Sequence, residues 1–183
     1  MVPNVVGRGV VSLVPAPPGG GKGWWLWALA GAGQDGGRFF GLPVRRQRIL
    51  WCTEEGQTFV NTARKFGIAP GVVKTLQRQN VPVTLDWEQT VKLVRREAWK
   101  QRCGLVVFDT VRAWCPQAEK DPKDAYAVMD VARRELTKPG LGVLFVHHDT
   151  KAGGSFGARV SGTYGLVGGV DILIELKRVS EHE

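Results

Sequence analysis

A glycine-rich segment with a single lysine, PAPPGGGKGWW at residues 15–25, contains the residue types that bind phosphate groups. Backbone N–H groups of the glycines at 19–21 can form an anion-binding nest at the positive end of a following helix. The Lys22 ammonium can then reach the outer phosphates of a nucleotide. The segment departs twice from the phosphate-binding pattern G-x-x-x-x-G-K-[ST], because Ala16 replaces the first glycine and Gly23 replaces the hydroxyl residue that ligates Mg²⁺.

We predict that this loop binds a nucleotide. An apolar strand-like run precedes it and an apolar helix-like run follows it, which is the context that a phosphate-binding loop requires. A glycine-rich turn without a function is the alternative. The residues predicted to contact the nucleotide are Ala16, Pro17, Pro18, Gly19, Gly20, Gly21, Lys22, Gly23 and Trp24.

Asp109 closes the apolar run LVVFD and is a candidate metal ligand. A carboxylate at the end of a buried strand holds Mg²⁺, often through water, in enzymes that transfer phosphoryl groups. A helix cap or a solvated surface acid is the alternative for an isolated aspartate. Since Asp109 follows the glycine loop in the order that such a site requires, we expect it to hold Mg²⁺.

Two adjacent acids, Glu54 and Glu55, follow the apolar run RILWCT. A carboxylate at the end of a neighbouring strand can polarise the water that attacks the γ-phosphate. Alternation along the strand would place Glu55 on the same side as Trp51 and Thr53, and Glu54 on the other side. We therefore predict that Glu55 is the catalytic base, with two solvated acids as the alternative.

Two histidines, His147 and His148, end the apolar run of FVHHDTK. A histidine at this position can donate a hydrogen bond to the γ-phosphate or to an adjacent loop. Metal binding is the alternative, but no third ligand accompanies the pair at a spacing typical of metal sites.

Apolar runs rich in Val, Leu, Ile and Phe alternate with segments of helical character. We predict strands at 9–14, 48–53, 72–77, 104–110, 141–148 and 170–176, and helices at 23–33, 58–67, 86–102 and 123–138. Such a pattern is typical of an α/β fold with a mostly parallel central sheet and helices on both faces. Ligands of such sheets bind at the carboxyl ends of the strands, where the candidate polar residues fall.

Composition limits the class of protein. The hydrophobic fraction of 43% and charged fraction of 23% are ordinary for a globular chain, and 183 residues suit one domain. A net charge of +8 favours a polyanionic partner, with a basic but inert surface as the alternative. The cysteines lack metal-ligand spacing, and no signal peptide or membrane span is evident, so we expect a cytoplasmic protein with reduced cysteines at 52, 103 and 115.

Five segments in order, PAPPGGGKG, ILWCTEEG, GLVVFDTVRAW, LFVHHDTKAGG and GVDILIEL, resemble the RecA-like P-loop ATPases. More narrowly, they resemble the RepA-like branch that is related to hexameric plasmid and phage replicative helicases. GRFFGLPV is also similar to the family's link between the phosphate-loop helix and the second strand. The resemblance spans roughly residues 5–178, and it implies a single RecA-like P-loop NTPase core over 1–183 that binds ATP with Mg²⁺.

The resemblance also implies roles for individual residues. Lys22 matches the phosphate-loop lysine, Asp109 the Mg²⁺-holding acid, Glu55 the catalytic glutamate and His148 the sensor of the γ-phosphate. The glycine-rich segment that follows His148 occupies the place of the loop that faces nucleic acid in the rings of this family, where the cations are Lys151 and Arg159. Cations that reach a neighbouring subunit's nucleotide would be Lys177 and Arg178.

The sequence therefore predicts an ATP-binding and ATP-hydrolysing domain that acts on single-stranded nucleic acid in replication or recombination. It is expected to form a homo-oligomer, such as a hexameric ring, and to have no membrane partner. One alternative is a regulatory module without useful turnover, because Gly23 lacks the Mg²⁺-ligating hydroxyl. Another is a basic nucleic-acid-binding scaffold with a vestigial nucleotide site.

Overall fold

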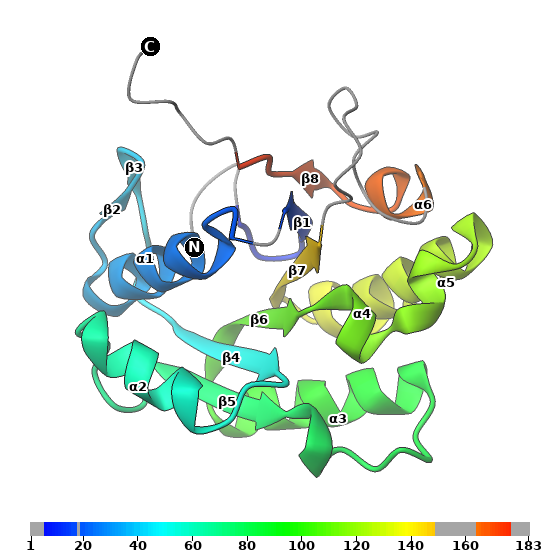
Figure 1. Cartoon of the computed structure of the whole chain (residues 1–183), viewed down its shortest axis with the longest axis horizontal. Helices are drawn as coiled ribbons and strands as arrows, with labels where there is room; N and C mark the ends of the chain where they lie inside the picture. The colour runs from blue at the N-terminus through cyan, green and yellow to red at the C-terminus, as the bar shows by residue number, and fades with distance from the viewer. Residues whose placement is uncertain (1–5, 18, 149–163, 177–183) are drawn as a thin grey trace.

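A six-stranded, all-parallel sheet forms the centre of the molecule, with helices on both faces (Figure 1). The computed structural model describes residues 6–17, 19–148 and 164–176. From edge to edge the strands are β5 (Val73–Gln77), β4 (Arg48–Thr53), β6 (Cys103–Asp109), β7 (Gly142–His148), β1 (Val11–Ala16) and β8 (Ile172–Leu173). The strand that precedes the glycine loop, β1, therefore lies between β7 and β8. This order confirms the predicted α/β class and the parallel arrangement.

The strands are β1 (Val11–Ala16), β4 (Arg48–Thr53), β5 (Val73–Gln77), β6 (Cys103–Asp109), β7 (Gly142–His148) and β8 (Ile172–Leu173), with β2 (Arg38–Phe39) and β3 (Leu42–Pro43) in a separate hairpin. The helices are α1 (Lys22–Asp35), α2 (Gln57–Lys65), α3 (Trp87–Lys100), α4 (Val111–Trp114), α5 (Pro122–Ala132) and α6 (Tyr164–Gly168). Short helical turns are η1 (Arg78–Asn80), η2 (Pro116–Glu119) and the π-helical η3 (Arg133–Thr137).

Alternate residues of the central strands feed two separate cores. On one face, α1 and α2 cover side chains such as Val14, Trp51 and Val107. On the other face, α3, α4 and α5 cover side chains such as Leu13 and Phe108. Because both faces are buried, these strands are apolar without a break, which is the property that made them recognisable in the sequence.

Helix α3 begins as its sequence predicts. Asp86 accepts a hydrogen bond from the Gln89 backbone N–H at 2.8 Å, and the Gln89 side chain accepts one from the Asp86 N–H at 3.1 Å. This reciprocal capping box satisfies two backbone donors that the helix itself leaves without a partner. The residues at helical spacing after it, Val91, Val94 and Ala98, are fully buried against the sheet.

Three differences from the sequence prediction stand out. The last strand, predicted over 170–176, is limited to β8, which pairs with β1 through two residues only. The helix predicted over 123–138 begins at Pro122 and changes after Ala132 to the π-helical turn η3. The hairpin β2–β3 in GRFFGLPV was not predicted as strand.

All three cysteines are free and buried, as expected for reduced core residues. No helix within 6–17, 19–148 or 164–176 combines the length and the apolar character that crossing a membrane requires.

Candidate active site

The glycine loop connects the carboxyl end of β1 to the first turn of α1. Gly21 caps the helix with φ +83°, and Gly19 has φ +73°, a backbone region that costs little only for glycine. Gly20 donates its N–H to the Pro17 carbonyl at 2.9 Å, and a Cβ on Gly20 would lie 2.9 Å from that same oxygen. All three glycines are therefore required by the shape of this turn, which presents backbone N–H groups at a helix N-terminus.

The Lys22 ammonium lies against the loop itself. Its Nζ donates to the Ala16 carbonyl at 2.6 Å and to the Pro17 carbonyl at 3.0 Å. Lys22 also lowers the pKa of Asp109 and that of His148, so its charge acts on both side chains. An incoming phosphate would compete with the two loop carbonyls for the same ammonium protons.

Asp109 ends β6 and lies opposite Thr53 of β4 in the sheet register. Burial raises the pKa of Asp109 to about 6, while the Trp51 indole, whose Nε1 donates to Oδ2 at 3.2 Å, and Lys22 lower it. Repulsion from Glu55 and from Glu54 raises it further. A divalent cation next to this carboxylate would offset both the burial and the repulsion.

Strand β4 ends at Thr53, so Glu54 and Glu55 follow the strand rather than extend its alternation. Both are exposed, and both raise the pKa of Asp109, Glu55 more than Glu54. The Glu55 N–H donates to Thr53 Oγ1 at 3.0 Å, which fixes the turn at this point. The expectation that only one acid faces the site is therefore too simple, although Glu55 remains the acid more strongly coupled to Asp109.

A cavity of about 390 Å³ lies next to Glu55, between α1 and α2. Its walls include the aromatic rings of Trp24, Trp27 and Phe66. Trp24 is 73% exposed and meets Phe66 edge-on, with ring centroids 4.7 Å apart. The predicted contact residue Trp24 therefore lies beside the phosphate loop and presents an aromatic surface to solvent.

The two histidines of β7 point to opposite faces of the sheet. His147 is fully buried, and its Nδ1 lies 3.3 Å from Glu119 Oε1 of η2. His148 is exposed at the end of the strand, opposite Ala16 of β1 in the register. Burial, Lys22 and Arg112 lower the pKa of His148, which favours a neutral imidazole near the loop. The pair therefore does not act as a unit, and only His148 lies with the candidate site.

Two residues near the site were not predicted from the sequence. Trp51 donates a hydrogen bond to the Asp109 carboxylate. In the sequence, only its predicted position on the same side of the strand as Glu55 indicated that it could lie near the site. Arg112, exposed on α4, acts on the pKa of both Glu119 and His148. The sequence feature that could have indicated Arg112 is its position three residues after Asp109, at the end of β6.

Gly23 lies in the first turn of α1, and a Cβ there would meet no atom within 4 Å. Leaving aside its two chain neighbours and the backbone of its own helix, a Cβ at position 23 is therefore not crowded by other residues, Trp25 among them. Within the described residues, no group of three or more His, Cys, Asp or Glu side chains has the arrangement of a metal site.

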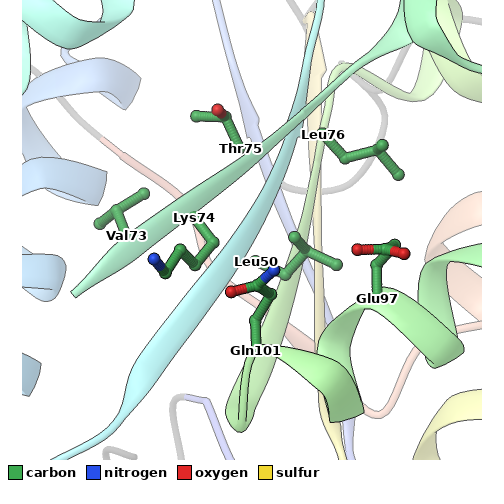
Figure 2. A pocket seen from close by; sticks show the side chains of 7 residues that line it. All are labelled: Leu50, Val73, Lys74, Thr75, Leu76, Glu97 and Gln101. Carbon is green, nitrogen blue, oxygen red and sulfur yellow. The ribbon is translucent and has the colours of Figure 1, made fainter. Parts of the chain in front are cut away.

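A second cavity of about 260 Å³ lies between β5 and α3 (Figure 2). Figure 2 shows Leu50, Lys74 and Leu76 on the strands, Glu97 on α3 and Gln101 directly after the end of α3. None of the predicted site residues lines this cavity, so it is separate from the loop and Asp109.

Five predicted site residues lie outside the described parts of the chain. They are Pro18 of the glycine loop, the nucleic-acid candidates Lys151 and Arg159, and the candidate subunit-interface cations Lys177 and Arg178.

Comparison with known families shows to which family the chain is similar. The model of a family described as an AAA domain matches residues 1–154. This range includes the glycine loop, the acids Glu54, Glu55 and Asp109, and both histidines. No curated protein matches the chain.

Proposed function

Because the chain belongs to the AAA domain family of P-loop ATPases, we propose that it is an ATPase whose site lies at the carboxyl ends of β1, β4, β6 and β7. The observation that carries the proposal is the convergence of four predicted residues. Lys22 acts electrostatically on Asp109 and on His148, and Glu55 acts on Asp109, although the four come from separate segments of the chain.

Each side chain has a proposed role. The loop N–H groups and Lys22 bind the phosphates, and Lys22 exchanges its contacts with the Ala16 and Pro17 carbonyls for phosphate oxygens. Glu55 orients and deprotonates the attacking water. His148, neutral because its pKa is lowered, donates one hydrogen bond to the γ-phosphate.

Asp109 would hold the metal ion that accompanies the nucleotide. Mg²⁺, when bound, neutralises the charge that develops on the phosphate oxygens. Asp109 binds as the carboxylate, and Trp51 fixes the orientation of that carboxylate. Gly23 supplies no hydroxyl, so water completes the ligand set on that side.

We further propose that residues 1–183 form one RecA-like domain of the RepA-like type that acts on single-stranded nucleic acid in replication or recombination. The net charge of +8 supports a polyanionic partner. Lys151 and Arg159 are the proposed nucleic-acid contacts, and Lys177 and Arg178 the proposed cations that reach the nucleotide of a neighbouring subunit in a ring.

A second candidate function is a nucleotide-binding regulatory module with negligible turnover. Gly23 favours it, because the missing hydroxyl removes one protein ligand of Mg²⁺. In that case ATP binding, rather than hydrolysis, would change the conformation or assembly of the chain.

ATP turnover with and without single-stranded DNA separates these functions. The proposed ATPase hydrolyses ATP, and the DNA accelerates the reaction. A regulatory module binds ATP without measurable turnover under either condition. Binding of DNA without any binding of ATP would instead indicate a scaffold with a vestigial nucleotide site.

A further inference from the structure

The hairpin β2–β3 ends in a two-residue turn that exposes an aromatic ring. Phe40 and Gly41 both have positive φ, +47° and +76°, the combination of a tight type I′ turn. This turn favours Asn, Asp or Gly at its first position, and a phenylalanine is uncommon there. Phe40 is nevertheless 80% exposed, so the monomer gains little burial in return for the unfavourable backbone conformation.

The hairpin is firmly anchored below its tip. Phe39, 4% exposed, packs edge-on against Trp25 of α1 with ring centroids 5.1 Å apart. Val44 is equally buried, and its N–H donates to the Gly37 carbonyl at 2.9 Å. Phe40 is therefore presented on a fixed support, which is the arrangement expected of a contact residue.

Four arginines lie in the hairpin or shortly after it in the sequence, at positions 38, 45, 46 and 48. Arg38, Arg46 and Arg48 are exposed and donate to the backbone carbonyls of Gly41, Gln34 and Gln101, at 2.6, 2.8 and 3.3 Å. A carbonyl orients a guanidinium but does not neutralise its charge. Arg45 is exposed as well, and Asp35 is the only acid in the sequence from 35 to 48.

The hairpin lies at the far end of α1 from the phosphate loop. The helix begins at Lys22, beside the loop, and ends at Asp35, directly before the hairpin (Figure 1). A helix of 14 residues spans about 21 Å, so this surface is separate from the strand-end site. A ligand of the hairpin would therefore not occupy the nucleotide site.

We propose that the hairpin surface, consisting of Arg38, Phe40, Leu42, Arg45 and Arg46, binds single-stranded nucleic acid. A base stacks on Phe40, and the guanidinium groups contact the flanking phosphates. Base stacking requires no particular sequence, so binding at this surface is sequence-tolerant. The inference rests on the proposed function for its class of partner, and it adds a contact surface outside the strand-end site.

Charge favours a nucleic acid over a second copy of the chain. The hairpin surface itself carries Arg38, Arg45 and Arg46 and no acid, so two such surfaces facing one another would repel, whereas a phosphate backbone is attracted. Guanidinium groups also match phosphate oxygens in a bidentate geometry.

The test is fluorescence anisotropy of a labelled oligothymidine across a salt series, for the full chain without nucleotide. Phe40→Ala should weaken binding by about 5- to 100-fold without changing the salt slope, because a lost stack removes no phosphate contact. Phe40→Trp should retain the affinity. Arg45→Ala with Arg46→Ala should flatten the slope of log K against log salt by about 1.4.

Matched controls use comparable side chains elsewhere. Trp99→Ala removes an aromatic ring that is 52% exposed on α3, and Arg96→Ala with Lys123→Ala removes two exposed cations. The aromatic control should leave the affinity unchanged, and the charge control should leave the slope nearly unchanged. Far-ultraviolet circular dichroism and melting temperature confirm that each variant is folded.

Equal affinity of Phe40→Ala and the parent would overturn the inference and leave the proposed function intact. If that variant instead loses self-association in sedimentation velocity while its oligothymidine affinity is unchanged, the surface binds a second copy. If the parent itself does not bind oligothymidine at low salt, both the inference and the nucleic-acid part of the proposed function are wrong, while ATP binding is tested separately.

Discussion

The indole Nε1 of Trp51 donates a 3.2 Å hydrogen bond to Oδ2 of Asp109, from one strand of the sheet to the next. Trp51 is 2% exposed and packs against Trp27 and Phe59, with ring centroids 4.7 and 4.8 Å away, so its indole is held in place. The bond lowers the pKa of Asp109, but burial outweighs it, and the pKa lies near 6 rather than at the usual 3.8. The carboxylate is thus oriented but costly to ionise in the absence of a cation.

Asp109→Asn should stabilise the protein without ligands. When folding raises the pKa of a carboxyl group, the folded protein loses stability as the pH rises from the pKa of that group in the unfolded state to its pKa in the folded state. The excess stability of the variant should therefore be greatest above pH 6 and should shrink as the pH falls from about 6 towards 4. Above pH 6 we expect the free energy of unfolding of the variant to exceed that of the parent by roughly 1 to 3 kcal/mol, measured by urea unfolding across this pH range. A variant less stable than the parent at pH 7 to 8 would show that the ionised carboxylate contributes favourably.

Gly23→Thr should tighten Mg²⁺ binding in the presence of ATP and raise turnover. A Cβ at position 23 meets no atom within 4 Å outside its chain neighbours and the backbone of its own helix, so a side chain can begin there. Gly23→Ala is the matched control, since it adds the Cβ without the hydroxyl. Mg²⁺ titrations of ATP hydrolysis compare the three proteins. If threonine and alanine behave alike, the hydroxyl position is not used by the metal.

Glu55→Gln should leave ATP binding intact and lower hydrolysis by roughly 10²-fold or more, the scale for loss of a positioned base. Glu54→Gln is the control on the adjacent residue, and it should have a much smaller effect, because Glu54 is less strongly coupled to Asp109. Single-turnover hydrolysis and nucleotide affinity are measured for both. The assignment fails if the Glu54 variant shows the larger loss.

Most of the sheet could be predicted from the sequence because its four central strands, β4, β6, β7 and β1, are buried on both faces and are therefore mainly apolar. Strand β4 has the predicted bounds, and β6 and β7 differ by one residue at one or both ends. Strand β8 is shorter than its apolar sequence suggests, because it pairs with β1 through only two residues. Hairpin β2–β3 was missed because its turn places a phenylalanine where glycine or asparagine would have signalled it.

The strand-end residues could be listed from the sequence, but their mutual geometry could not. The sequence presents His147 and His148 as a pair, whereas the structure places them on opposite faces of β7, and nothing in the sequence pairs His147 with Glu119, which is 28 positions away along the chain. The bond from Trp51 to Asp109 likewise depends on the pairing of β4 with β6. Such contacts between distant segments determine the charge environment of the site residues, and the local sequence pattern does not predict them.

Lys151→Ala with Arg159→Ala should weaken single-stranded DNA binding and flatten its salt slope by about two at most, if both cations contact phosphates. ATP affinity should barely change, because the phosphate loop is separate in sequence. Anisotropy of labelled oligonucleotides across a salt series measures both quantities, with Arg96→Ala and Lys123→Ala as the control pair. An unchanged affinity with an unchanged slope would exclude these two cations as contacts.

The loop before α1 is proposed to bind ATP through Lys22. Calorimetric titration of ATP with Mg²⁺ into the full chain tests this binding most directly. The parent should bind, and Lys22→Ala should show no measurable binding, because it removes the only side-chain cation of the loop. Lys123→Ala, which removes an exposed cation at the start of α5, should bind like the parent. If Lys22→Ala binds ATP with the affinity of the parent, the account of this site is wrong.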